Sequence, residues 1–275
     1  RSAALMPVLT PSRASTEMVY AVRYASLLWG VISGISSRSS MSPGIGTQIT
    51  PLEWRVHAPL IEAINRLKAE KNAVILAHNY QTPEIFHCVA DLVGDSLALA
   101  REAARTDADV IVLCGVHFMA EVADILSKPS QIAILPDLAA GCSMADMANL
   151  VKVNQCWREL ATALNPDELV TPVTYINSAA NLKAFCGEHG GIVCTSTNAP
   201  TILDWAFSKR EKVLFFPDQH LGRWTGYKKG IPLDEMVVWD PDLEYGGLTP
   251  EQIRKAKILL WKGHCSVHQM FQPVH

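Results

Sequence analysis

The chain has 275 residues, of which 49% are hydrophobic and 19% charged, so it is long enough to bury the core of one large domain or two ordinary ones. This composition excludes a disordered chain, a collagen and a coiled coil. The 24 basic residues against 27 acidic ones give a net charge of -3 and no broad basic field, so we expect a small-molecule or protein ligand, no nucleic acid and no membrane partner.

The first forty residues differ in composition from the rest of the chain. They hold four arginines, nine serines and a single acid, Glu17. The apolar stretch over residues 25–35 is about half the roughly 20 residues that a membrane-spanning helix needs. We expect residues 1–50 to be a disordered extension in front of the folded part, with Met41 as the natural start. A targeting segment and an added helix are the alternatives.

From Pro51 onward, short apolar strands alternate with amphipathic helices, which is typical of parallel sheets built from βαβ units. The pattern predicts an α/β fold in two repeats, residues 51–145 and 146–275. In the first repeat we predict three helices and three strands, over residues 56–71, 97–105 and 119–126 and over residues 73–77, 109–113 and 132–135. In the second we predict helices and strands over residues 144–164, 199–209 and from Thr249, and over residues 171–178, 191–196, 213–216 and 258–261.

Each repeat ends on a cysteine in a glycine-containing loop after a strand. Gly141-Cys142-Ser143 closes the first repeat and Gly263-His264-Cys265-Ser266 the second, and Pro136-Asp137 matches Pro217-Asp218 in the same way. The wide spacing of the two cysteines is unlike that of a zinc ribbon. Cys142 and Cys265 are therefore candidate metal ligands, with small buried thiols as the alternative. The seven cysteines contain no CxxC pair, which favours reduced thiols and a cytoplasmic location.

Polar side chains gather where the predicted strands end, which is where ligands bind in parallel sheets. They are His78, Tyr80, Ser96, Tyr175, Asn177 and Ser196. His78 and Tyr80 are two residues apart and form a candidate proton donor and acceptor pair, although His78 could equally be a partly buried histidine. Ser96 and Ser196 precede helices, so each is either part of a helix cap or a site for a carboxylate or phosphate.

Seven motifs follow one another from about Trp54 to the end of the chain. They are His78-Asn79-Tyr80-Gln81, Gly94-Asp95-Ser96, Gly115-Val116-His117-Phe118-Met119-Ala120-Glu121, Gly141-Cys142-Ser143-Met144, Tyr175-Ile176-Asn177-Ser178, Thr195-Ser196-Thr197-Asn198-Ala199 and Gly263-His264-Cys265-Ser266-Val267-His268. Together, in this order, they resemble the quinolinate synthase family of NAD biosynthesis.

The resemblance implies three three-layer αβα domains with short parallel sheets around a pseudo-threefold axis, each giving one cysteine to a [4Fe-4S] cluster. It implies a transferase of pyridine nucleotide biosynthesis that condenses iminosuccinate (iminoaspartate) with dihydroxyacetone phosphate to quinolinate, with loss of phosphate and water. The upstream supplier is then L-aspartate oxidase or aspartate dehydrogenase. The family's third domain carries a third cysteine ligand, which we expect to be missing here, so that two of three repeats are present.

The resemblance also implies roles for individual residues. Cys142 and Cys265 match the first two cluster ligands, and Tyr80 and His78 match positions that move protons. The positions that hold the carboxylates of iminosuccinate are His78, Ser96, Tyr175, Ile176, Asn177 and Ser196. Two alternatives stay open, namely a truncated, non-catalytic remnant that keeps anion sites but cannot hold the cluster, and a zinc hydrolase that uses Cys265, His264 and His268.

Overall fold

The computed structural model describes residues 49–272 and residue 274, which fall into two compact units divided between Ala140 and Gly141. We call residues 49–140 the first unit and the described residues from 141 onward the second unit. The expected extension over residues 1–50, apart from Ile49 and Thr50, and the proposed start at Met41 lie outside the described residues. The division precedes the Cys142 loop, whereas the repeat pattern alone places the boundary after residue 145.

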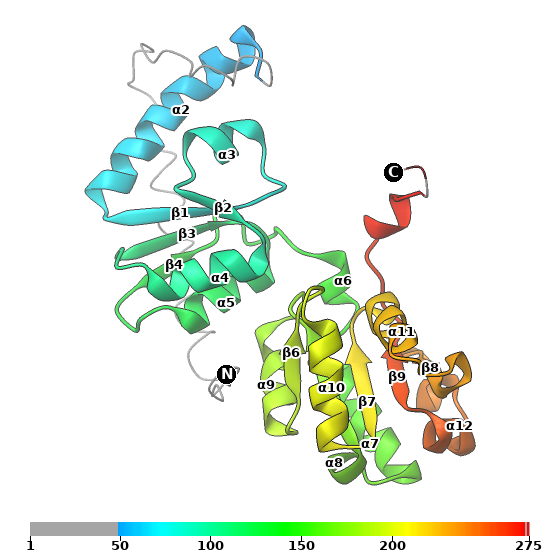
Figure 1. Ribbon diagram of the computed structural model, residues 1–275. Helices are drawn as coiled ribbons and strands as arrows, with labels where there is room; N and C mark the ends of the chain where they lie inside the picture. The colour runs from blue at the N-terminus through cyan, green and yellow to red at the C-terminus, as the bar shows by residue number, and fades with distance from the viewer. Residues whose placement is uncertain (1–48, 273, 275) are drawn as a thin grey trace. The chain divides into compact units, whose positions relative to one another are not determined.

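The first unit is a four-stranded parallel sheet with helices on both faces. Its strand order is β2-β1-β3-β4, with bounds β1 Ala73–His78, β2 Leu92–Gly94, β3 Val110–Cys114 and β4 Ile132–Ile134. Helices α2 (Pro51–Glu70) and α3 (Pro83–Cys88) cover one face, and α4 (Ser96–Arg105) and α5 (His117–Leu126) cover the other (Figure 1). This is a three-layer αβα arrangement.

The second unit has the same layers around a five-stranded parallel sheet of order β6-β5-β7-β9-β8. The strands are β5 Val170–Tyr175, β6 Ile192–Cys194, β7 Lys212–Phe216, β8 Met236–Trp239 and β9 Ile258–Trp261. The helices are α6 Ser143–Asp146, α7 Leu150–Ala163, α8 Pro166–Leu169, α9 Ala180–Glu188, α10 Ala199–Lys209, α11 Gln219–Lys228 and α12 Pro250–Lys255, with short 3₁₀ turns at Leu233–Glu235, Glu244–Gly247 and His268–Met270. The predicted α/β class with repeated αβα layers is confirmed.

Strand β7 explains why the second unit has an apolar core on each side of its sheet. Val213 and Phe215 belong to the cluster that packs against α10, whereas Leu214 and Phe216 belong to the cluster that packs against α7 and α9. Successive side chains of a strand point to opposite faces, so a strand covered on both faces reads as an unbroken apolar run. Removing these side chains from water is the main source of the unit's stability.

The two sheets share a strand order, which corrects one detail of the repeat. In the first unit β1 lies between β2 and β3, and β4, the strand before the Cys142 loop, lies beside β3. In the second unit β5 lies between β6 and β7, and β9, the strand before the Cys265 loop, lies beside β7. Strand β4 therefore corresponds to β9, and β3 corresponds to β7. The match of Pro136-Asp137, after β4, with Pro217-Asp218, after β7, is wrong because it pairs strands at different positions in the sheets.

Two predicted helix boundaries were also wrong. The first helix begins at Pro51 because Thr50 forms a capping box with Glu53, which the apolar spacing from residue 56 does not reveal. The single helix predicted over residues 144–164 is two helices, α6 and α7. The break occurs because the Asn149 side chain accepts a hydrogen bond from the Lys152 N–H (3.0 Å) and so starts a new helix.

Helix α11 lies so close to the sheet that we expect Gly222→Ala to destabilise the protein by about 1–3 kcal/mol. A Cβ at Gly222 would lie 2.6 Å from Leu260 Cδ2 and 2.7 Å from Phe215 Cδ1. Gly187, in α9, has no neighbour within 4 Å of such a Cβ, so Gly187→Ala is the matched control and should be neutral or stabilising by up to about 1 kcal/mol. Urea unfolding measures both; equal stability of Gly222→Ala and the parent would contradict this packing.

Asp167 links the stability of the second unit to pH. His189 Nδ1 lies 2.8 Å from its carboxylate and Trp157 Nε1 donates to it at 3.2 Å. The hydrogen bond from His189, above all, holds the pKa of Asp167 below its usual 3.8. A lowered carboxyl pKa stabilises the fold above the unfolded pKa, and that contribution is lost as the pH falls through the folded pKa.

We therefore expect Asp167→Asn to be less stable than the parent at pH 6, with a difference that shrinks below about pH 4. Thermal unfolding from pH 3 to pH 7 measures this difference. A destabilisation that is the same at every pH would show that the Asp167 charge contributes nothing.

Candidate functional site

In the first unit, His78 and Tyr80 lie together at the carboxyl end of β1. Their ring centroids are 4.0 Å apart with an interplanar angle of 31°, and the Tyr80 N–H donates to His78 Nδ1 at 3.4 Å. His78 pairs with Gly94 in the sheet, and the Asn79 N–H donates to the Gly94 carbonyl (3.1 Å), which brings β1 beside the start of α4. The structure thus places the imidazole, the phenol and the loop that leads to Ser96 at one sheet edge.

The environment of His78 favours a neutral imidazole. Burial lowers the pKa of His78, and the nearby Asp95 carboxylate opposes this shift to a smaller extent. Since Nδ1 accepts the Tyr80 N–H, the neutral ring carries its proton on Nε2. The Tyr80 hydroxyl points to Met119 Sδ at 3.8 Å, and the Tyr80 side chain is half-exposed. A neutral imidazole beside an accessible phenol can accept or donate a proton near neutral pH.

Ser96 is the first residue of α4, but Asp95 makes the cap. The Asp95 carboxylate accepts from the Ala98 N–H at 2.8 Å. A negative charge already present at this helix end opposes the binding of a second anion there. Recognition of a carboxylate at this edge would therefore depend on the Ser96 hydroxyl and His78 more than on the helix dipole, which differs from the interpretation of the sequence.

In the second unit the equivalent sheet edge lies beside the start of α10, and the turn that caps this helix carries no charged side chain. The Thr195 N–H donates to Asn198 Oδ1 (2.6 Å) and the Asn198 N–H to Thr195 Oγ1 (3.3 Å), so neutral side chains form the turn before α10. Ser196 is exposed in this turn and lies near the half-buried Tyr175 at the end of β5. Burial raises the pKa of Tyr175, with the nearby Ser196 side chain opposing this shift, so the Tyr175 hydroxyl stays a donor at neutral pH.

The turn after β5 fixes the rest of this edge. The Ile176 N–H donates to the Cys194 carbonyl (2.8 Å), and the buried Ser178 hydroxyl donates to the Tyr175 carbonyl (2.8 Å). Ile176 is buried, and Asn177, between Ile176 and Ser178, is half-buried. Tyr175 and Ser196 therefore lie near each other, with Asn177 on the adjoining turn. An uncharged helix end with two hydroxyls is suited to an anionic group.

The loops that carry Cys142 and Cys265 meet within the second unit, although 123 positions separate them. The residues that follow the two cysteines touch, with 3.5 Å between Ser143 Oγ and Ser266 Oγ. Both thiols are free and half-buried. A negative charge on Cys265 would raise the pKa of Tyr175, so the Cys265 loop lies near the carboxyl end of β5.

The other five cysteines are poor candidates for ligands. Burial raises the pKa of each of their thiols, that of Cys114 to about 11, and a protonated thiol is a poor metal ligand. They are Cys88, Cys114, Cys156, Cys186 and Cys194. Cys142 and Cys265 have the donor chemistry for an iron-sulfur cluster. Across the part of the chain that the structure describes, however, no three histidine, cysteine or acidic side chains come close enough together to hold a metal ion.

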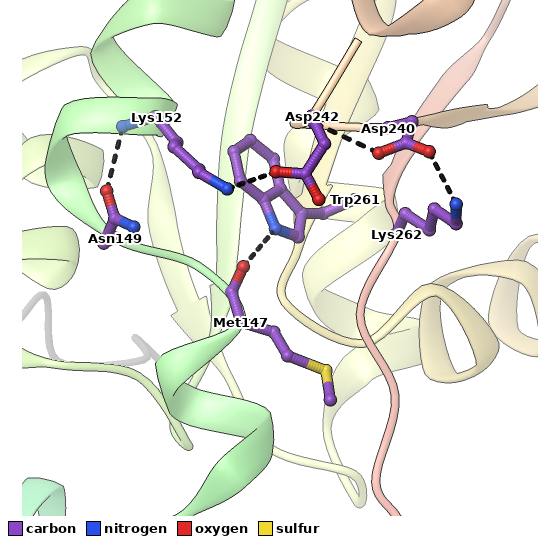
Figure 2. A network of polar contacts seen from close by, with 7 residues as sticks. All are labelled: Met147, Asn149, Lys152, Asp240, Asp242, Trp261 and Lys262. Carbon is purple, nitrogen blue, oxygen red and sulfur yellow. Dashed lines mark hydrogen bonds and ion pairs between the residues drawn. The ribbon is translucent and has the colours of Figure 1, made fainter.

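A network of polar contacts joins the segments that lead to the two cysteines (Figure 2). The Trp261 Nε1–H donates to the Met147 carbonyl at 2.9 Å. At the surface, Lys152 pairs with Asp242 (2.5 Å) and Lys262 with Asp240 (2.5 Å), and the Asp242 N–H donates to Asp240 Oδ1 (3.1 Å). Together these contacts tie the chain after Cys142 to the strand end before Cys265.

Asp218 is a residue of this edge that the sequence interpretation missed. It is buried, caps α11 by accepting from the His220 and Leu221 N–H groups (2.8 and 3.3 Å), and raises the pKa of Tyr175 by its charge. Asp218 also bridges to Gly263, where any Cβ would collide with the Pro217 carbonyl oxygen. The signal in the sequence is an aspartate two residues after the buried strand β7, in the Pro217-Asp218 pair.

Among the described residues, none of the helices is both long enough and apolar enough to span a bilayer.

Comparison with known proteins gives consistent results. The family described as "Quinolinate synthetase A protein" matches residues 62–275. Proteins named quinolinate synthase are similar to this chain in Nocardioides sp. (56% identity over 223 residues, 76% of this chain and 56% of the relative) and in Acidobacterium capsulatum (54% over 213 residues, 78% and 57%). A third, in Herpetosiphon aurantiacus, is 52% identical over 232 residues, which cover 84% of this chain and 60% of the relative.

The chain thus spans somewhat more than half the length of these curated relatives. The match extends over most of the chain and includes both units, the two cysteine loops and the strand-end residues. The chain therefore belongs to the quinolinate synthetase A protein family.

Proposed function

We propose that this chain forms part of a quinolinate synthase that condenses iminosuccinate with dihydroxyacetone phosphate. The reaction forms one C–C bond and one C–N bond, and releases one phosphate and two water molecules, so atoms balance with no oxidant or reductant. An amino-acid oxidase or dehydrogenase acting on L-aspartate would supply the imine. The name quinolinate synthase, which the similar proteins carry, supports this proposal and implies an enzyme of NAD biosynthesis. We also propose a cytoplasmic location, since the seven cysteines are free thiols.

The observation that carries the proposal is the meeting of the two cysteine loops at Ser143 and Ser266. Cys142 and Cys265 would hold two corners of a [4Fe-4S] cluster, with a third thiolate from outside the described residues. A cluster held by three thiolates supplies a Lewis-acidic iron with an open coordination site. The alternative, a remnant that keeps its anion sites but holds no cluster, is favoured only by the lack of a third ligand among the described residues.

The chain's own residues would bind the substrate and move its protons. The hydroxyls of Tyr175 and Ser196 can donate to one carboxylate of iminosuccinate at an uncharged helix end, with Asn177 as a further donor and Ile176 as a buried support. In the first unit, the Ser96 hydroxyl can donate to an anionic group. His78 and the Tyr80 hydroxyl of the same unit would exchange protons with a bound substrate as the ring closes. His78 Nδ1 becomes free to accept a proton only once the Tyr80 N–H no longer donates to it.

We expect Cys142→Ala to abolish the cluster in the full-length protein, because the two remaining thiolates would leave two of the four irons without a protein ligand. Iron and sulfide analysis with the visible absorption spectrum, after anaerobic reconstitution, measures this loss. Cys156→Ala, which removes a fully buried thiol of α7, is the control and should keep the cluster. A normal [4Fe-4S] spectrum from Cys142→Ala would refute the ligand assignment.

We expect Tyr80→Phe to lower kcat by about 10²- to 10⁴-fold, the usual contribution of a general acid or base, with iron content unchanged. The ring and its contact with His78 remain in this variant, so only the hydroxyl is lost. Tyr227→Phe, at an exposed tyrosine of α11, is the matched control. Activity of Tyr80→Phe equal to that of Tyr227→Phe would exclude Tyr80 from proton transfer.

A further inference from the structure

We infer that Trp261 is a positioning residue, which holds the Cys142 and Cys265 loops at a fixed separation through its hydrogen bond to Met147. The inference rests on the proposed function, because it takes the two thiols as partners in binding one group. It goes further by assigning a task to a buried side chain that touches neither thiol. The supporting observations are the backbone hydrogen bonds that connect each cysteine loop to the Trp261–Met147 hydrogen bond.

On the first side, a single helical turn connects Cys142 to Met147. Cys142 precedes α6, and its carbonyl accepts from the Asp146 N–H at 3.1 Å. The Met147 N–H in turn donates to the Met144 carbonyl at 3.2 Å. Met144 itself is buried, which anchors the turn in the unit. Fixing the Met147 carbonyl therefore fixes the backbone of Cys142 as well.

On the second side, a tight turn connects Trp261 to Cys265. The Gly263 N–H donates to the Trp261 carbonyl at 2.7 Å, and the Gly263 carbonyl accepts from the Gln219 N–H at 3.0 Å. The His264 N–H donates to Met147 Sδ at 3.3 Å. Met147 thus receives hydrogen bonds from both ends of the Trp261–His264 turn, one on its carbonyl oxygen and one on its sulfur.

The contacts of this network differ in burial, and therefore in how much each contributes to holding the two cysteine loops in place. The Trp261 side chain is fully buried and Met147 is half-buried, so loss of the indole N–H would remove a partner from the Met147 carbonyl at a partly buried site, which is costly. In the Lys152–Asp242 and Lys262–Asp240 ion pairs one partner is more than half exposed (Asp242 75%, Lys262 56%), and pairs open to water contribute little. The indole hydrogen bond, and not the surrounding charges, is the contact that sets the separation of the loops.

The test uses Cd²⁺ as a probe of the two thiols in the 275-residue chain. Cys88→Ser and Cys114→Ser form the background, since these are the other two cysteines that are not fully buried. Titration is followed by thiolate-to-cadmium absorption, which reports sulfur ligands alone and needs no enzyme activity. We expect Trp261→Phe to weaken Cd²⁺ binding about tenfold, the size of one buried hydrogen bond.

Matched variants separate the hydrogen bond from packing. Trp239→Phe removes the same volume from the neighbouring strand of the same core cluster, and should bind Cd²⁺ like the background protein. Trp261→benzothienylalanine replaces the indole N–H by sulfur at nearly the same volume, so it decides the question if Trp261→Phe fails to fold. Far-ultraviolet circular dichroism checks the fold of each variant.

The outcomes distinguish this inference from the proposed function. If Cys142→Ser and Cys265→Ser abolish the absorption but both Trp261 variants bind as tightly as Trp239→Phe, the positioning role is overturned and the thiol pair stands. If neither cysteine substitution changes the absorption, the pairing of the thiols is wrong, and the proposed function and this inference fail together.

Discussion

The parallel register of β5, β7 and β9 is the constraint on which the candidate site of the second unit depends. Because these strands run in one direction, the residues that follow them emerge at a single sheet edge. Tyr175 ends β5, Asp218 follows β7, and Cys265 follows β9. The apolar clusters on both faces hold this register, since a one-residue slip of a strand would exchange the side chains of its two faces.

The two units use the same layers but differ in charge at their binding edges. In the first unit an acid, Asp95, caps the helix beside His78, whereas in the second the equivalent turn is closed by the neutral side chains of Thr195 and Asn198. The neutral start of α10 suits an anion, although the buried Asp218 carboxylate lies at the same sheet edge, and the acidic start of α4 suits proton exchange through a neutral imidazole. A repeat in sequence therefore does not imply a repeat in chemistry.

Much of the fold could be predicted from the sequence, because long buried strands such as β1 and β7 and the helices with strong apolar spacing leave clear patterns. Strand β2 escaped prediction because Leu92–Gly94 offers only two apolar residues before a glycine, and β8 was missed although all four of its residues are apolar. The start of α7 was missed because the break depends on one side-chain cap at Asn149. Capping is a local hydrogen bond and leaves little trace in a hydrophobic pattern.

The candidate site was predicted less completely than the fold. Motif resemblance identified Cys142, Cys265 and the strand-end residues, but contacts such as Ser143 with Ser266 and Trp261 with Met147 join residues more than a hundred positions apart, and no spacing rule indicates them. We propose that the full-length protein carrying these two units makes quinolinate. Anaerobic incubation of the reconstituted protein with iminosuccinate and dihydroxyacetone phosphate, analysed by mass spectrometry, tests this proposal most directly. We expect quinolinate and phosphate in equal amounts; a protein with a complete cluster that forms neither product would contradict the proposal.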